Sequence, residues 1–347
     1  MKIIKLTLIS IIACLIFIAS LSSGININVK KIQNKKSEEL NMFEADVYVD
    51  DDAPPDWYDA THVKTIIEGI NNATEGNTIF VYNGIYLEKQ INIFKKINLI
   101  GEDKNSTFID GKNQEAHVIV IIEDFVNISD FSIKNSGGSI WRPFSGIRIV
   151  ANFTKIINNI FQNNYIGVDI RNTSNTVSKN LFLNDNIELM SAHNNLISEN
   201  TFVSNDPPRA GVISLLDSDN NIVHGNIFTG ESEKVIYVDN SHGNVIKNNQ
   251  IKDGYEYGIL LFNSRKNDIH HNNLKNNFKG IVLEGCSFNK IHHNNFFNCK
   301  IKALTILSPL NIWFRNYWNR PRILPKRVFG IFGKFDFLPR LIPNDIV

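Results

Sequence analysis

The chain has 347 residues, of which 43% are hydrophobic and 20% charged, and this composition excludes an intrinsically disordered protein. Its 36 basic and 35 acidic side chains nearly balance, so the chain lacks the surplus of positive charge that nucleic-acid binding requires. The commonest residue types are isoleucine, with 52 residues, and asparagine, with 49, and both far exceed ordinary usage. Codon bias alone can inflate both, so the positions of the asparagines have to decide whether the fold uses them.

The N-terminus has the organisation of a secretory signal. Two lysines precede an apolar run from Leu6 to Leu21, and small residues follow up to Gly24. We therefore expect residues 1–24 to be a signal peptide or an uncleaved N-terminal anchor, and this segment to be the chain's sole membrane contact. The protein would be secreted, extracellular or held at the cell surface, or periplasmic where a second membrane exists. Residues 25–45 are polar and lysine-rich, which predicts a linker.

The next segment has the pattern of a strand followed by an amphipathic helix. Val47–Val49 reads as a strand, and residues 61–72 place apolar side chains on one side of a helix. Such a helix would cover the open end of a following β-array and form its cap. Residues 78–86, 97–100 and 118–122 then predict the strands of the first, irregular turns of that array.

The body of the chain is an array of repeats with the unit N-x-I-x-x-N-x-[FIL]. The inner asparagine of each unit recurs every 20 to 26 residues, a spacing that codon bias cannot produce. These asparagines are Asn159, Asn180, Asn200, Asn226, Asn249, Asn272, Asn294 and Asn316. Phe131 occupies the same place one unit earlier.

A period near 22 residues with short apolar runs and no helical pattern is too short for a propeller blade and excludes leucine-rich and ankyrin repeats. The repeats therefore predict an all-β, right-handed parallel β-helix over residues 46–319, with one repeat to each coil. Equivalent side chains would stack in columns, with isoleucine and phenylalanine in the core. The repeated asparagine would sit at a tight turn in the left-handed conformation, and its amide would bond to the asparagines of neighbouring coils.

Several motifs resemble one known family. They are Y-V-D-D-D-A-P-P-D-W-Y from Tyr48, I-N-L-I-G-E-D from Ile97, I-D-G from Ile109 and the N-x-I repeats. Together they resemble the NosD-like secreted β-helix proteins over about residues 47–319. The resemblance implies a pectin-lyase-like solenoid and export. Its superfamily groups carbohydrate-binding and sugar-hydrolase domains, and its namesake is a periplasmic protein that assists copper-site maturation of nitrous-oxide reductase. Function is less well implied, because this scaffold hosts many activities.

Catalysis would need carboxylates close together on one sheet. Asp169 and Glu188 lie one coil apart beside Arg148 and Arg171, and these four are the candidate catalytic residues. The competing interpretation is a solvated strand face of mixed charge. The only dense acidic cluster is Asp50, Asp51, Asp52, Asp56 and Asp59, which suits either a structural calcium ion or turn and helix-end roles.

Histidines form the candidate metal site. The motif I-H-H-N-N occurs twice, 22 residues apart, so the two histidine pairs should stack one coil apart. His224 falls in the same column two coils earlier. The candidate ligands are His224, His270, His271, His292 and His293. Neutral imidazole suits copper and zinc, and copper fits the resemblance, although after residue 24 the chain offers little cysteine or methionine for copper(I).

One set of turns, which follows the N-x-[FIL] strand, is enlarged and aromatic. Flat apolar rings suit sugar stacking and arginine suits acidic groups, so these turns predict a glycan-binding side. The candidate residues are Trp141, Arg142, Phe144, Tyr165, Arg209, Tyr255 and Tyr257. The competing interpretation is that the aromatic rings pack on neighbouring turns.

Residues 320–347 form a basic, proline-rich and aromatic tail, in place of the acidic, glycine-rich cap of the family. We expect it to close the last coil, with contact to anionic lipid or cell wall as the alternative. The whole chain then predicts a monomeric, non-catalytic protein that binds polysaccharide or another surface partner. The alternatives are a polysaccharide lyase or glycoside hydrolase, and a copper accessory protein.

Overall fold

The computed structural model describes residues 44–204, 211–330 and 334–346. Contacts divide the chain after Ala45, and Asp46–Val347 forms one compact unit by itself. This unit is the predicted right-handed parallel β-solenoid, of about 11 turns. The predicted signal or anchor and nearly all of the predicted linker lie outside the described residues. Among the described residues no helix is long and apolar enough to cross a membrane.

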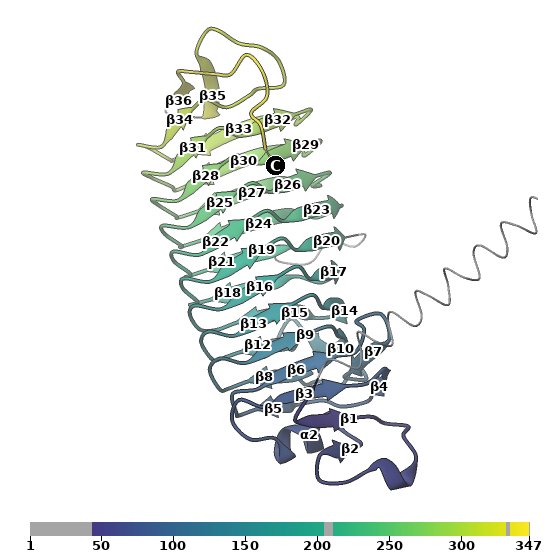
Figure 1. Ribbon diagram of the computed structural model, residues 1–347. Coiled ribbons are helices and arrows are strands. Elements are labelled where there is room, and N and C mark those ends of the chain that lie inside the picture. The colour runs from purple at the N-terminus through teal and green to yellow at the C-terminus, as the bar shows by residue number, and fades with distance from the viewer. Residues whose placement is uncertain (1–43, 205–210, 331–333, 347) are drawn as a thin grey trace, which may run out of the picture. The chain divides into compact units, whose positions relative to one another are not determined.

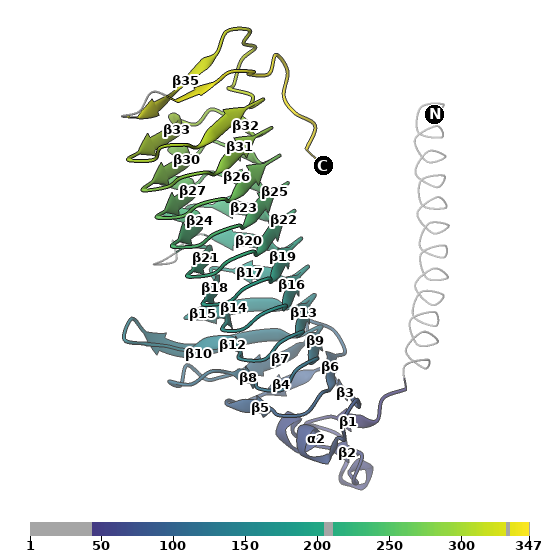
Figure 2. The ribbon, with the colours of Figure 1, turned by 90° about the vertical axis from the view of Figure 1, so that its left-hand side faces the viewer.

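Each coil of the solenoid contributes one strand to each of three parallel sheets, A, B and C, in that order along the chain (Figures 1 and 2). Sheet A contains β1 Val47–Val49, β2 His62–Val63, β3 Thr78–Val81, β6 Asn98–Gly101, β9 Asn127–Ser129, β13 Lys155–Ile157, β16 Thr176–Ser178, β19 Leu196–Ser198, β22 Ile222–His224, β25 Val245–Lys247, β28 Asp268–His270, β31 Lys290–His292, β34 Ile312–Phe314 and β36 Lys334–Asp336. Sheet B contains β4 Gly84–Tyr86, β7 Thr107–Asp110, β10 Ser132–Ser139, β14 Ile160–Asn164, β17 Leu181–Leu183, β20 Thr201–Ser204, β23 Ile227–Gly230, β26 Gln250–Lys252, β29 Asn273–Lys275 and β32 Asn295–Phe297, with β11 Arg142–Pro143 paired antiparallel to β10. Sheet C contains β5 Ile91–Ile93, β8 Ile119–Ile121, β12 Ser145–Ile149, β15 Ile166–Ile170, β18 Ile187–Met190, β21 Ile213–Leu216, β24 Lys234–Asp239, β27 Tyr257–Phe262, β30 Lys279–Glu284, β33 Ile301–Ile306 and β35 Lys326–Gly330.

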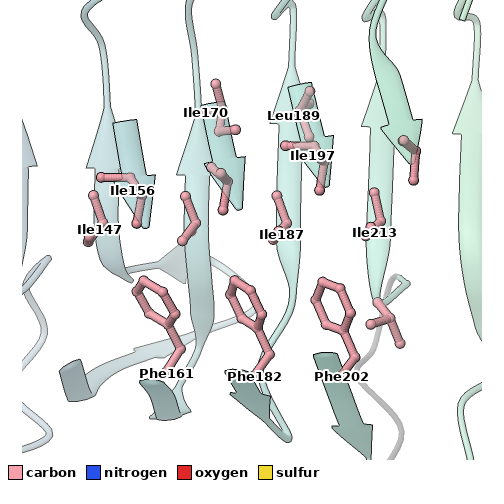
Figure 3. Close-up of a cluster of buried hydrophobic side chains, with 14 of the residues drawn as sticks. Ile147, Ile156, Phe161, Ile170, Phe182, Ile187, Leu189, Ile197, Phe202 and Ile213 are labelled. Atoms are coloured by element: carbon pink, nitrogen blue, oxygen red, sulfur yellow. The ribbon is translucent and has the colours of Figure 1, made fainter. Parts of the chain in front are cut away.

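The core consists of side-chain columns that run along the solenoid axis, because a parallel register places equivalent residues above one another. Phe161, Phe182, Phe202 and Phe228 stack with ring centroids 4.6 to 4.9 Å apart, and all four are buried. Figure 3 shows the first three of these rings. Aliphatic residues of sheets A and C fill the opposite walls. At the last coil Trp318 stacks on Phe296 at 4.8 Å, and Trp313 lies in the sheet A column above Ile291; both are buried.

The repeated asparagines form a buried hydrogen-bonded ladder. The backbone N–H and the amide Nδ2 of each one donate to Oδ1 of the next; for Asn180 both distances to Asn200 Oδ1 are 3.0 Å. Phe131 N donates to Asn159 Oδ1, which places Phe131 at the predicted ladder position. A second ladder, which the sequence reasoning did not assign, runs parallel to the first through Asn175, Asn195, Asn221, Asn244, Asn267, Asn289 and Asn311.

The prediction that the ladder asparagines are left-handed is wrong. The positive φ belongs to the residue directly before each of them, for example Lys179 (φ 59°) and His271 (φ 53°). The turn from sheet A to sheet B has two residues. The first residue bends the chain from sheet A to sheet B with its side chain outside, and the second can then direct its amide into the turn. Residue types at the outer position are therefore free to vary.

The N-terminal helix is shorter than predicted. It is α2, Ile66–Asn72, because Thr65 and Glu68 form a capping box, and His62–Val63 pairs with β1 instead of continuing the helix. The 3-10 turn η1 covers Pro55–Trp57. Helix α2 buries Ile66 and Ile70 and lies beside the first strands of the solenoid. Its role as a cap remains a prediction.

The C-terminal tail forms an antiparallel hairpin of β35 and β36 that pairs with β33 and β34. Asp336 is fully buried and ends the inner asparagine ladder. Its Oδ2 accepts from Asn316 N at 3.0 Å and from Trp318 Nε1 at 2.9 Å.

The thiols of Cys286 and Cys299, which precede this tail, are buried and form no disulfide.

Candidate functional site

The candidate residues gather on two surfaces: the outer face of sheet C with its flanking turns, and the outer face of sheet A near the C-terminal end. The turns that lead from sheet B to sheet C, here called the B–C turns, are the ones that the sequence marked as aromatic. Strands hold the outward side chains in register, so a residue on one coil lies above its equivalent on the next.

The predicted carboxylate and guanidinium group is present on sheet C. Asp169 pairs in register with Arg148 on one side and Glu188 on the other. Arg171 Nε lies 2.6 Å from Asp169 Oδ1, and Arg171 Nη2 lies 3.3 Å from Glu188 Oε1. The Asp169 side chain is only 1% exposed and makes ion pairs without hydrogen-bond geometry. Burial raises the pKa of Asp169 more than the two guanidinium groups lower it.

His117 belongs to the same group, although no motif or spacing in the sequence selected it. Its Nδ1 lies 2.8 Å from Ser145 Oγ, and Arg148 Nη1 lies 3.3 Å from its Nε2. Burial, with the charges of Arg148 and Arg171, lowers the pKa of His117 to about 4. Burial and the charge of Asp169 raise the pKa of Glu188. The group is therefore a partly buried network in which the arginines are held in place by carboxylates.

A projecting arm carries the first of the predicted aromatic residues. Strands β10 and β11 form this arm, which extends from the side of the solenoid (Figure 2). Trp141 at its tip is 88% exposed, while Arg142 pairs with Glu115 at 3.4 Å. Phe144 instead packs edge-on against His117.

The remaining turn candidates differ in exposure. Tyr165 is half-buried in the turn between β14 and β15, beside the base of the arm. Tyr255 is 69% exposed and lines a shallow hollow of about 340 Å³ with Asp253 and Phe278. Tyr257 is covered by Lys279, whose Nζ lies 4.2 Å from the ring centroid. Arg209 lies outside the described residues.

Sequence reasoning missed a lysine–tyrosine–lysine column of Lys234, Tyr257 and Lys279 that extends this surface, with Tyr237 beside it on sheet C. Tyr237, on the coil before Tyr257, has Lys234 Nζ 4.8 Å from its ring centroid, and its hydroxyl donates to Asp239 Oδ2 at 2.8 Å. The alternation of lysine and tyrosine at equivalent positions of β24, β27 and β30 was the available signal. Sheet C thus presents charged groups at one part of its length and tyrosines at another.

On sheet A the structure brings four of the five candidate histidines together. His270 Nδ1 lies 2.8 Å from His271 Nδ1, and the equivalent distance between His292 and His293 is 2.7 Å. The two pairs stack, with ring centroids 5.0 and 4.9 Å apart. His224 is separate, because Lys247 lies between it and His270 in the column.

Three of the four paired histidines have lowered pKa values, and the fourth has a carboxylate partner. Burial lowers the pKa of His270 and of His293 to about 4 and also lowers that of His271. His292 Nε2 lies 2.8 Å from Asp268 Oδ1. With Nε2–H donating to this carboxylate, Nδ1 of His292 keeps its lone pair, as in metal sites where an outer carboxylate orients a histidine ligand.

Only part of the predicted acidic cluster comes together. Carboxylate oxygens of Asp50, Asp51 and Asp52 lie within 4.8 Å of one another. Asp59 instead accepts hydrogen bonds from Thr61 N and His62 N, at 2.7 and 2.8 Å, so it has the turn role that was the alternative. The calcium site stays a prediction.

Comparison with known proteins agrees with this architecture. Residues 183–327 match the family described as periplasmic copper-binding protein (NosD), which is less than half of the chain. No curated protein sequence gives a significant match.

Among solved structures, the solenoid is similar to the Dettilon tailspike protein (gp208), with a TM-score of 0.63 and 15% identity over 78% of this chain and 62% of the tailspike. It is also similar to a mannuronic acid specific polysaccharide family 6 lyase from human gut microbiota, with a TM-score of 0.52 and 15% identity over 71% of this chain and 75% of the lyase. The chain therefore spans less than two thirds of the tailspike. These likenesses show a pectin-lyase-like fold.

Proposed function

We propose that this is an exported β-helix protein that binds polysaccharide along sheet C and its B–C turns without cleaving it. The observation that carries the proposal is the run of aromatic side chains on this one side. Trp141 and Tyr255 are exposed, Tyr257 begins the strand that follows Tyr255, and Tyr237 lies one coil earlier on sheet C. A rigid row of rings and charged groups suits a linear polymer, because successive coils can contact successive sugars.

The charged group on sheet C supports recognition better than hydrolysis. Acid–base cleavage of a glycosidic bond needs two carboxyl groups that flank the bond. Asp169 is buried beneath Arg148 and Arg171, so its oxygens face guanidinium groups and not a ligand. The same ion pairs fix the arginines for hydrogen bonds to sugar hydroxyl or carboxylate oxygens. A polysaccharide lyase or hydrolase remains the alternative, and a lyase is among the similar folds.

Polysaccharide binding is tested with residues 46–347 on a panel of acidic and neutral polymers that includes polymannuronate, followed by analysis of the products. We expect retention without shorter products. Trp141→Ala and Tyr255→Ala should each weaken binding about tenfold, the value of one aromatic contact of about 1.4 kcal/mol. Phe288→Ala is the matched control, because Phe288 is exposed but lies on the turn between sheets C and A. Cleavage, or equal losses in all three variants, would contradict the proposal.

A second candidate function is binding of a transition-metal ion, which the paired Nδ1 atoms favour. Two neutral imidazole nitrogens 2.8 Å apart have the spacing of adjacent ligands on a metal with bonds of about 2.0 Å. Imidazole ligands suit Cu²⁺, Ni²⁺ and Zn²⁺, and the matched family is described as copper-binding. In this alternative the protein is a metal accessory protein.

Metal binding is tested by calorimetric titration of residues 46–347 with Cu²⁺, Ni²⁺ and Zn²⁺ at pH 7. We expect binding that the double variant His271→Gln/His293→Gln abolishes and His224→Gln preserves, because His224 lies two coils away. Loss with His224→Gln, or retention in the double variant, would assign the metal to another site.

A further inference from the structure

The C-terminal end of the solenoid concentrates positive charge. From Lys300 to Val347 the chain has nine basic and two acidic residues, although the whole chain carries a net charge of only +1. One of the two carboxylates, Asp336, is buried in the asparagine ladder. The basic residues Lys300, Lys302, Arg315, Arg320, Arg322, Lys326, Arg327 and Arg340 are here called the C-terminal basic face. None of them is joined to a carboxylate by any ion pair found among the described residues.

Six of these cations line one hollow. It has a volume of about 330 Å³ and is lined by Lys300, Lys302, Arg320, Arg322, Lys326 and Arg327, with no acidic residue. Burial, and then the charges of Arg322, Lys302 and Arg320, lower the pKa of Lys326. The cations therefore repel one another in the free protein, and an anion in the hollow would relieve that repulsion.

Two guanidinium nitrogens on this face have no partner. Nε of Arg322 and Nε of Arg340 are buried and make no hydrogen bond. Buried polar donors are normally satisfied, so these two arginines retain unused hydrogen-bonding capacity. Both arginines also line a second hollow, of about 670 Å³, which the first adjoins through Arg322.

The second hollow combines this charge with exposed aliphatic side chains. Ile323 borders it and is 84% exposed, and the adjacent Leu324 is 78% exposed. The facing segment, residues 337–342, contributes Phe337, Leu338, Leu341 and Ile342, which are all exposed. Monomeric soluble proteins rarely expose so many large aliphatic residues together, and such patches mark contact surfaces.

We propose that the C-terminal end of the solenoid docks on an anionic lipid bilayer, with the C-terminal basic face against headgroup phosphates and the aliphatic side chains in the headgroup–acyl boundary. The combination of the two features selects the bilayer. An acidic polysaccharide would pair with the cations but would not bury the isoleucine and leucine side chains. An anionic bilayer provides both phosphate groups for the cations and an apolar region for the aliphatic side chains. The segments involved begin at Lys300, just before β33, and lie at the C-terminal end of the solenoid, so the docked protein would stand end-on (Figure 1).

The test uses residues 46–347, which form a compact unit and lack the N-terminal apolar run. Sedimentation is measured with vesicles of phosphatidylglycerol and phosphatidylcholine mixed, and with phosphatidylcholine alone. We expect binding to the anionic vesicles, loss of most of it at about 0.5 M salt, and little binding to the neutral ones. A soluble polyuronate is tested in parallel.

Two variants separate charge from apolar insertion. Arg320→Gln/Arg322→Gln/Lys326→Gln should weaken vesicle binding about 100-fold, since each charge near an anionic surface contributes about fivefold. Ile323→Ser/Leu324→Ser should weaken it about tenfold or more, with the salt dependence unchanged.

The matched control is Arg265→Gln/Lys266→Gln/Lys290→Gln, which removes three exposed charges elsewhere on the solenoid and should change binding by about twofold or less. All changes are at exposed or partly buried positions, and circular dichroism checks that each variant is folded.

Three results would overturn the proposal. Equal binding to neutral vesicles would show adhesion without charge recognition. Equal losses in the control and test variants would show that the basic face is not the contact. Binding to polyuronate without binding to vesicles would assign the face to an acidic polymer. None of these results bears on sheet C, so the proposed polysaccharide function is tested independently.

Discussion

Truncating one rung of the inner asparagine ladder should destabilise the solenoid far beyond an ordinary polar substitution. Oδ1 of Asn249 accepts from Asn226 N at 2.9 Å and from Asn226 Nδ2 at 3.1 Å, and its Nδ2 donates to Val223 O at 3.0 Å and Asn272 Oδ1 at 2.9 Å. Asn249→Ala removes all four hydrogen bonds. A buried N–H left without an acceptor costs about 1–3 kcal/mol and each of the three other lost bonds about 1 kcal/mol, so the free energy of unfolding should fall by about 4–6 kcal/mol.

Urea unfolding followed by circular dichroism measures this loss, and hydrogen exchange of the Asn226 amide reports the local opening. Asn92→Ala is the control, because Asn92 is exposed on β5 and its change should stay within about 0.5 kcal/mol. A loss below about 1 kcal/mol for Asn249→Ala, or unchanged exchange at Asn226, would refute the structural role assigned to the ladder.

Three further outcomes are expected. Burial raises the pKa of Asp185 to about 7, so ionisation of this carboxyl destabilises the folded state as the pH rises from about 4 to about 7. The difference in free energy of unfolding between Asp185→Asn and the native chain should therefore grow by about 2–4 kcal/mol from about pH 4.5 to pH 8, as measured by urea titrations. Phe202→Ala removes one ring of the stacked column and should cost about 3–5 kcal/mol by the same assay, with a smaller loss contradicting tight packing there. The pKa values of His270 and His293 lie near 4, below the unfolded value, so stability should fall as pH drops from about 6.5 to about 4, and His270→Gln/His293→Gln should flatten that dependence.

Periodicity carried the predictions that depend on repetition. A spacing of about 22 residues with alternating apolar positions indicates that each repeat forms one coil. Equivalent side chains then stack, because every coil has the same register. That is why the proximity of Asp169 to Glu188, and the stacking of the two histidine pairs, follow from the amino-acid sequence alone. The core columns were predictable for the same reason.

What escaped prediction depends on contacts that no period describes. The position of the left-handed residue is set by a two-residue turn, and either residue satisfies the sequence pattern. His117 joins the charged group because it lies just before β8, and β8 pairs with β12, the strand that contains Arg148. The two residues are 31 positions apart, a separation outside the 20 to 26 residues of the regular repeat. Asp336 follows Asn316 in the ladder at a spacing of 20 residues, which fits the repeat, but the N-x-I-x-x-N pattern is absent there and an aspartate stands in place of the asparagine, so the pattern did not identify it.

The acceptor at the end of the ladder gives the array a direction and a stop. Every asparagine rung both receives bonds from the coil before it and donates to the coil after it, so a coil can be inserted or deleted within the array without creating an unmatched group. A carboxylate can only accept hydrogen bonds, so the row of side-chain hydrogen bonds ends at Asp336. Such a solenoid can lengthen by duplication of single repeats. Its last coil offers no amide donor to a following rung, either on a further coil of the same chain or on the first coil of another molecule.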